Sequence, residues 1–235
     1  RSTTIFWILR SSIDFLKKAI SANYRISESH LELARAYFEL SKYLAAANEY
    51  ELVKNEKLFN AQDFYNHAVS LEEAGKEGEA IAVYRKAITA FGSNKERDAL
   101  IARLKVGKAD LESKGYSAAL SQFNFIVNAD PQGNIVSDIY FLLADGYQGA
   151  NKSSEAISSL EKAISLDKTN IEAYARLADL YEKNKMSDKA KATYEKMMAL
   201  SPNDPKVYLT LAVYNLKAEK YSESLEQFVK ANSLQ

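Results

Sequence analysis

The chain of 235 residues contains no cysteine, which excludes disulfide bonds, thiolate metal sites and cysteine nucleophiles. Glycine and proline are scarce, at eight and three residues, so the chain has few turn formers and is expected to consist of helices. Its two histidines leave little for a histidine-based catalytic or metal site. The lack of cysteine favours an exported protein over a cytosolic one, and no targeting signal identifies the compartment.

An excess of one charge and a long apolar run are also missing. The 31 Lys and Arg residues balance the 31 Asp and Glu residues, whereas nucleic-acid-binding proteins usually carry a basic excess, so we expect no nucleic-acid partner. The densest apolar run covers residues 5–9, too short for a membrane span, which needs about 20 apolar residues. We expect this run to form a buried helix face rather than the tail of a removed anchor.

A motif of Leu, Ala and a following Tyr marks an internal repeat. Its copies are Leu33-Ala34-x-x-Tyr37, Leu143-Ala144-x-x-Tyr147 and Leu177-Ala178-x-x-Tyr181. The last two copies lie 34 residues apart, and a second small residue follows 12 positions after each alanine. This register defines six repeats, which we number in chain order: 27–60, 61–94, 100–133, 137–170, 171–204 and 205–235. Short inserts at 95–99 and 134–136 interrupt the array.

The pattern resembles the tetratricopeptide repeat over residues 27–235, because that family has small residues at positions eight and twenty and an aromatic at position twenty-four. The eighth positions here are Ala34, Ala68, Gly107, Ala144, Ala178 and Ala212. The twentieth positions are Ala46, Ala80, Ala119, Ala156, Ala190 and Ser224. The resemblance implies an all-α fold, a right-handed α-solenoid of stacked antiparallel helix pairs in one continuous array. One helix pair cannot bury its apolar face alone, so neighbouring pairs must stack.

The two ends of the array differ from the repeats. Residues 1–26 do not make a full repeat, and we expect a helix over residues 4–22 that packs on the N-terminal face of the array. The polar capping helix usual in the family does not follow the last repeat in this sequence. Within the array, Glu77-Gly78 and Lys114-Gly115 stand where the turn between two helices is expected.

No catalytic arrangement or phosphate-binding loop is recognisable, so we expect neither an enzyme nor a small-molecule substrate, cofactor or metal. His67 and His30 occupy packing positions of the repeat and are expected to be buried and hydrogen-bonded.

In the resembled family, positions two, five, nine, twelve and thirteen of each first helix line a concave groove. All six fifth positions are apolar here, which indicates an apolar stripe with Phe141 and Tyr65 as its largest members, and acidic residues at 138–182 form an acidic patch. The candidate groove residues are Leu31, Arg35, Tyr65, Val69, Leu104, Lys108, Asp138, Phe141, Asp145, Glu172, Asp179, Glu182 and Leu209. Alternatively, the fifth-position side chains pack on neighbouring repeats and the acids are merely solvated.

These features favour a non-enzymatic protein–protein interaction module whose groove binds a partner segment with apolar and basic residues. The carboxylate clamp of chaperone-binding repeats needs Lys at position five and Asn at position nine, and no repeat here has either. The alternative is a structural scaffold subunit that contacts its neighbours through the ends of the array, which would include end-to-end self-association.

Overall fold

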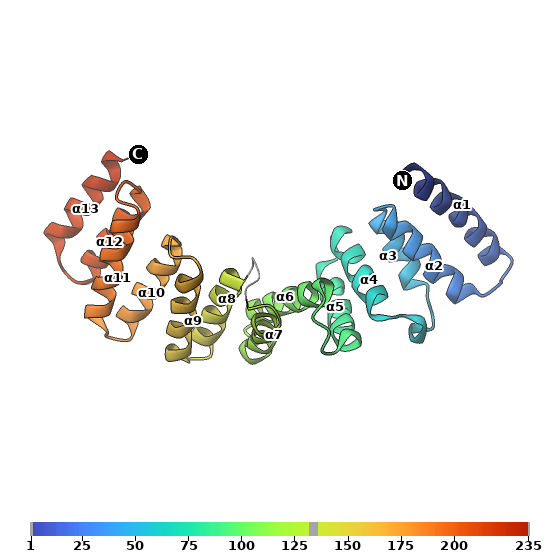
Figure 1. Cartoon of the computed structure of the whole chain (residues 1–235), viewed down its shortest axis with the longest axis horizontal. Coiled ribbons are helices and arrows are strands. Elements are labelled where there is room, and N and C mark those ends of the chain that lie inside the picture. Colours follow the sequence, from blue (N-terminus) through green and yellow to red (C-terminus); the bar gives the residue numbers. More distant parts are fainter. Residues whose placement is uncertain (1, 132–135, 235) are drawn as a thin grey trace. The chain divides into compact units, whose positions relative to one another are not determined.

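The structure, a computed structural model, describes residues 2–131 and 136–234, so most of the insert expected at 134–136 lies outside the described residues. In this part of the chain there are thirteen α-helices and no strand, which confirms the all-α repeat class (Figure 1). Residue contacts divide the chain between Ser113 and Lys114 into two compact units. The division falls between the two helices of repeat three, and we describe each unit by itself.

The N-terminal unit contains six α-helices and one short 3-10 helix. They are α1 (Ser2–Ser21), α2 (Ile26–Glu39), α3 (Tyr43–Glu51), η1 (Glu56–Leu58), α4 (Ala61–Glu73), α5 (Glu77–Phe91) and α6 (Arg97–Glu112). The C-terminal unit contains seven helices. They are α7 (Tyr116–Ala129), α8 (Val136–Gly149), α9 (Ser153–Leu166), α10 (Ile171–Lys183), α11 (Ser187–Leu200), α12 (Pro205–Lys217) and α13 (Tyr221–Ser233). Helices that follow one another within a unit pack against each other.

Small residues lie where paired helices approach most closely, as the register predicts. Ala68 on α4 and Ala80 on α5 are buried, and so are Ala178 on α10 and Ala190 on α11. A residue without a long side chain lets the two backbones approach, and a larger neighbour then fills the space beside them. In the last pair, Ser224 Oγ donates a 2.8 Å hydrogen bond to the carbonyl of an alanine on α12, so this polar exception is satisfied.

The turn inside each repeat depends on one residue with a left-handed backbone, always at position fifteen. These residues are Ser41, Gly75, Lys114, Asn151, Lys185 and Glu219, with φ between 55° and 77°. In repeat five, the N–H of Met186 bonds to the carbonyl of Tyr181, and the N–H of Lys185 to the carbonyl of Glu182, which is the Schellman pattern of helix ends. The turn expected at Lys114-Gly115 therefore lies where the sequence places it, whereas Gly78 lies inside α5 and the turn of repeat two is at Gly75.

The helix α1 lies at the outer edge of the N-terminal unit and packs on α2 (Figure 1). Its Ile13 is buried in a cluster with Leu33 and Ala36 of α2, and Leu9 is partly buried there. The expectation that residues 5–9 form a buried face is wrong for two of them, because the side chains of Trp7 and Ile8 are exposed. They lie on the side of α1 away from α2, where no described residue covers them.

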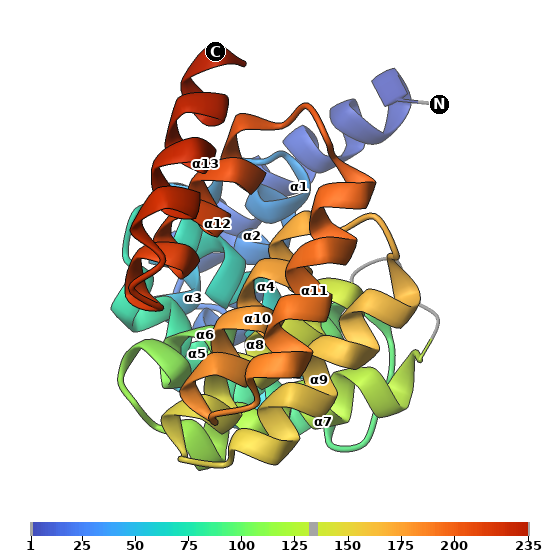
Figure 2. The same cartoon turned by 90° about the vertical axis from the view of Figure 1, so that its left-hand side faces the viewer.

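The core of the C-terminal unit runs from α8 to α12. Tyr194 and Met197 of α11 are buried in it together with Leu177 of α10 and Val207 of α12. The last helix, α13, packs on α12 at the outer edge of this unit (Figure 2). Its Phe228 stands at position twenty-four, and it is 37% exposed because no helix of the described chain packs on its outer side.

Candidate protein-binding groove

The first helices of repeats four to six, α8, α10 and α12, form one wall of the C-terminal unit. Spacings of three and four residues along each helix place the expected groove positions on one helix face. Between α10 and α12 lies a cavity of about 340 Å³. Its lining residues are Ala175, Asp179, Tyr194, Leu209, Thr210, Val213, Tyr214 and Lys217.

The cavity between α10 and α12 has an apolar floor and a charged rim. Leu209 and Val213 are exposed and lie four residues apart on one face of α12. The Tyr214 ring packs on the Tyr194 ring of α11, with 4.5 Å between their centroids. An apolar side chain of a ligand could therefore be buried here against aliphatic and aromatic groups.

A smaller cavity of about 200 Å³ lies between α8 and α10. Arg176 dominates it: its guanidinium nitrogens lie 3.0 Å from Asp145 Oδ1 and 2.8 Å from Glu172 Oε1. The same guanidinium lies 5.3 Å from the centre of the Phe141 ring. Phe141, expected as an open apolar anchor, is thus partly covered by an arginine of the next repeat.

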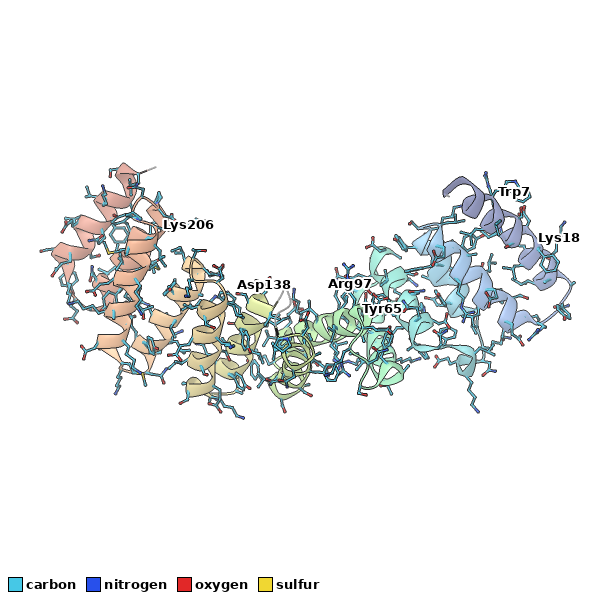
Figure 3. The ribbon with its side chains drawn as sticks, in the orientation of Figure 1. Trp7, Lys18, Tyr65, Arg97, Asp138 and Lys206 are labelled. Atoms are coloured by element: carbon cyan, nitrogen blue, oxygen red, sulfur yellow. The ribbon has the colours of Figure 1, made fainter. Side chains whose placement is uncertain are left out.

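The acidic patch is a network of mixed charge. Arg176 joins Asp145 to Glu172, and Asp179 lies 2.7 Å from Lys183 Nζ and 3.6 Å from Lys217 Nζ. All these side chains remain substantially exposed, so their carboxylates can exchange partners. Three acids of the expected acidic patch are thus paired with cations of the chain, and Asp138 of α8 is exposed at the helix start (Figure 3).

Glu182 has a structural partner that the sequence did not reveal. The Tyr194 hydroxyl donates a 2.9 Å hydrogen bond to Glu182 Oε1, and Tyr84 and Glu72 form the same contact at 2.8 Å in repeat two. Burial raises the pKa of Glu182, and the hydrogen bond from Tyr194 opposes that shift. Position twelve therefore ties the first helix to the second in these two repeats.

In the N-terminal unit, three of the candidate groove residues serve packing. Leu31 is buried, and Tyr65 is buried beside Tyr84, with 5.9 Å between ring centroids (Figure 3). Arg35 donates two 2.6 Å hydrogen bonds to Asp63. The apolar stripe is consequently not open at Leu31 and Tyr65, because these side chains fill the space between helices.

The remaining candidates of this unit lie around a small cavity or beside it. Val69 and Leu104 are partly buried and Lys108 is exposed. A cavity of about 150 Å³, lined in part by Lys108, is crossed by an ion pair between Lys105 and Glu72. This opening is smaller and more polar than the cavity between α10 and α12.

The two histidines have structural roles. His30 Nδ1 lies 2.7 Å from Glu49 Oε2, as expected for a hydrogen-bonded histidine. The His67 ring stacks on the Tyr50 ring, with 5.1 Å between the ring centroids. Its Nε2 has no hydrogen-bond partner among the described residues, although a hydrogen-bonded histidine was expected. Burial lowers the pKa of His67 to about 4, so the ring is neutral at pH 7.

Sequence reasoning missed three residues of the wall: Arg176, Tyr214 and Lys217. Lys217 occupies position thirteen, one of the groove positions, so its place could have been predicted. Arg176 occupies position six, and nothing in the sequence shows that its side chain turns back over Phe141.

Within the described ranges, no group of three or more His, Asp or Glu side chains could hold a metal ion. Among those residues, too, no helix has the length and apolar character of a membrane span.

The geometry defines a helical-repeat protein with an open, partly apolar wall. Residues 61–94 and residues 147–213 match family models described as tetratricopeptide repeat. The chain therefore contains tetratricopeptide repeats over these two ranges. No curated protein matches it in sequence at a significant level.

Three solved structures illustrate the shared fold. A crystal structure of MamA has a TM-score of 0.58 and 23% identity, covering 71% of this chain and 93% of its own. YrrB, described as a tetratricopeptide-repeat protein with an unusual peptide-binding site, has a TM-score of 0.56 and 21% identity, and the match covers 75% of this chain and 87% of the YrrB chain. The C-terminal part of a repeat-containing protein from Cytophaga hutchinsonii has a TM-score of 0.60 and 19% identity. The match covers 100% of this chain and 92% of that protein's chain.

The coarse function follows from the repeats. Tetratricopeptide repeats form a protein-interaction fold, and stacked helix pairs present extended surfaces to partners. The chain is accordingly a protein–protein interaction module.

Proposed function

We propose that the wall formed by α8, α10 and α12 binds a segment of another protein. The observation that carries this proposal is the cavity of about 340 Å³ between α10 and α12, with Leu209 and Val213 exposed on one side. Its volume lies at the lower end of the range for ligand pockets, which suits a single anchoring side chain. YrrB, which has the same fold, is described as having a peptide-binding site, and this supports a peptide ligand here.

The ligand segment combines an apolar anchor with Lys or Arg. The anchor enters the cavity beside Leu209, and a basic residue next to it pairs with Asp179 or Asp145. Both carboxylates are about 40% exposed and already held by cations of the chain, so a ligand cation exchanges with these and gains little net affinity. The apolar anchor therefore supplies most of the affinity, and charge sets the register and the encounter rate.

A peptide-display selection on the whole chain tests this function. We expect enrichment of peptides that carry one large apolar residue flanked by Lys or Arg. Leu209→Glu together with Val213→Glu should weaken these peptides at least tenfold, because the variant places charges in the apolar cavity. The control is Lys189→Glu on α11, which is exposed and outside the cavity. Peptides that bind the double variant as tightly as the parent would show that the groove is elsewhere.

A second candidate function is a scaffold subunit that contacts its neighbours through its ends, and α13 favours it. Leu225 of α13 is 64% exposed, whereas Leu120 and Ala47, at the same position of repeats three and one, are buried. Together with Tyr221 and Val229 it gives α13 an outer apolar face. Light scattering after size-exclusion chromatography separates the two functions: an oligomer that Leu225→Glu returns to a monomer supports the scaffold, and a monomeric parent supports the groove.

A further inference from the structure

The outer side of α1 carries large apolar side chains that no described residue covers. Trp7 is 70% exposed, Phe15 is 72% exposed and Ile8 is also exposed. Ile8 and Phe15 are seven residues apart and share one helix face, while Leu9 and Ile13 face α2. We call Trp7, Ile8 and Phe15 the outer face of α1. Figure 3 shows Trp7 and Lys18 on the side of α1 that points away from α2.

Cations border this outer face. Three basic side chains, Arg10, Lys17 and Lys18, lie on α1 against one acid, Asp14. Within the described part of the chain, neither Lys17 nor Lys18 has a carboxylate within ion-pair distance. On the wall of the repeats, Lys183 and Lys217 each have one, since both lie within ion-pair distance of Asp179.

A cavity of about 530 Å³ adjoins the outer face, and its lining holds three cations, Arg10, Lys17 and Lys42, against one acid, Asp14. It extends from Trp7 to Tyr37 of α2 and to Lys42, which precedes α3. Lys17 Nζ and Lys42 Nζ each lie 5.9 Å from the centre of the Tyr37 ring. Two ammonium groups so placed leave donors for an anionic group such as a phosphate diester.

The apolar face at the other end of the chain has a different character. On α13, the exposed apolar residues are accompanied by Glu223, Glu226 and Lys230, which carry a net charge of −1. On α1, the corresponding sum over Arg10, Asp14, Lys17 and Lys18 is +2. A tryptophan beside lysines is typical of helices that lie at the surface of anionic membranes. The charges therefore separate the two faces: α13 suits a protein helix, and α1 suits a lipid headgroup layer.

We propose that α1 docks the chain on an anionic membrane surface. Trp7, Ile8 and Phe15 enter the boundary between headgroups and acyl chains, Lys17 and Lys18 attract the anionic headgroups, and the cavity beside Tyr37 receives one lipid phosphate. The helix lies in the plane of the membrane and does not span it. The wall of α8, α10 and α12 takes no part in this contact, so the two proposals fail or succeed independently.

The single tryptophan of the chain, Trp7, reports this docking directly. Vesicles of phosphatidylcholine, with or without phosphatidylglycerol, are titrated into the whole chain while tryptophan emission and co-sedimentation are recorded. We expect a blue shift and co-sedimentation with the phosphatidylglycerol vesicles, both weakened by molar salt because exposed charges are then screened.

Matched variants identify the surface. Ile8→Ser with Phe15→Ser keeps the reporter and should weaken binding at least tenfold, whereas Leu225→Ser with Val229→Ser on α13 should leave it unchanged. Lys17→Glu with Lys18→Glu should abolish the preference for anionic vesicles, and Lys220→Glu with Lys230→Glu is its charge-matched control. Circular dichroism confirms that each variant remains helical.

Several outcomes would overturn the proposal. Equal binding to both kinds of vesicle would show that the cations play no part. A blue shift that grows with protein concentration in the absence of vesicles, and is lost in the α13 variant, would assign the outer face to a second copy of the chain. Absence of any shift or co-sedimentation would also refute membrane docking.

Discussion

Replacing Arg35 by alanine is expected to destabilise the N-terminal unit strongly. Arg35 donates two 2.6 Å hydrogen bonds to Asp63, whose side chain is only 3% exposed. Asp63 also accepts a 2.9 Å bond from the backbone N–H of Asn60 in the capping box of α4. Truncation of the arginine leaves the carboxylate buried with a single donor, and removing one partner of a buried ion pair costs about 3–5 kcal/mol. The pair stabilises the contact between repeats one and two.

Hydrogen exchange combined with urea unfolding measures this loss, because a repeat array can open locally before it unfolds as a whole. Amides of α2 and α4 should lose protection before those of α10. The control is Arg176→Ala, since its partners Asp145 and Glu172 are exposed and its loss should cost under about 1 kcal/mol. The double variant with Asp63→Ala should lose less than the sum of its single changes, because no charge is then left buried. A loss below about 1 kcal/mol for Arg35→Ala, or simple additivity, would refute this reasoning.

Three further outcomes follow from local geometry. Gly149→Ala should cost about 1–3 kcal/mol in thermal unfolding, because an added Cβ would overlap the Tyr116 ring, and Tyr116→Ala should restore tolerance at that site. Lys185→Gly should raise the free energy of unfolding by about 0.5–1 kcal/mol, since glycine adopts its φ of 60° without strain, and Gly75→Ala should lower it by a similar amount. The unfolded chain binds a proton at His67 near pH 6.5 and the folded chain only near pH 4. Stability should therefore fall by up to about 3 kcal/mol as pH drops through this window, and His67→Phe should flatten that part of the urea-midpoint profile.

The repeat register could be predicted from sequence because small residues recur at fixed intervals. Ala178 and Ala190 are buried where two helices meet, as the register requires. The turns were harder to predict: the left-handed residue is glycine only at Gly75, and elsewhere the helix-end hydrogen bonds hold residues such as Lys185 in that conformation. Spacing alone predicts which residues lie on the same helix face, but not whether a side chain on that face is exposed or buried between helices.

The candidate groove shows the same limit more clearly. Leu209 and Leu31 share position five, yet Leu209 is exposed beside a cavity, whereas Leu31 is buried in a cluster with Tyr50 and Val53. The ion-pair partners of charged residues were harder still to predict, since a long side chain can reach several neighbouring helices. Arg176 reaches Asp145 on the preceding repeat, and Arg35 reaches Asp63 on the following one. Neither direction is fixed by the repeat pattern.

The most direct test of the central claim is photo-crosslinking of a selected peptide that carries benzoylphenylalanine in place of its apolar anchor. Mass spectrometry of the crosslinked chain identifies the helices that contact the anchor. We expect attachment to α10 and α12, at residues lining the cavity between them, such as Leu209 and Val213. Attachment that Leu209→Glu abolishes would support the groove. Attachment to α13, to α1 or to the exposed side of α11 around Lys189 would contradict it.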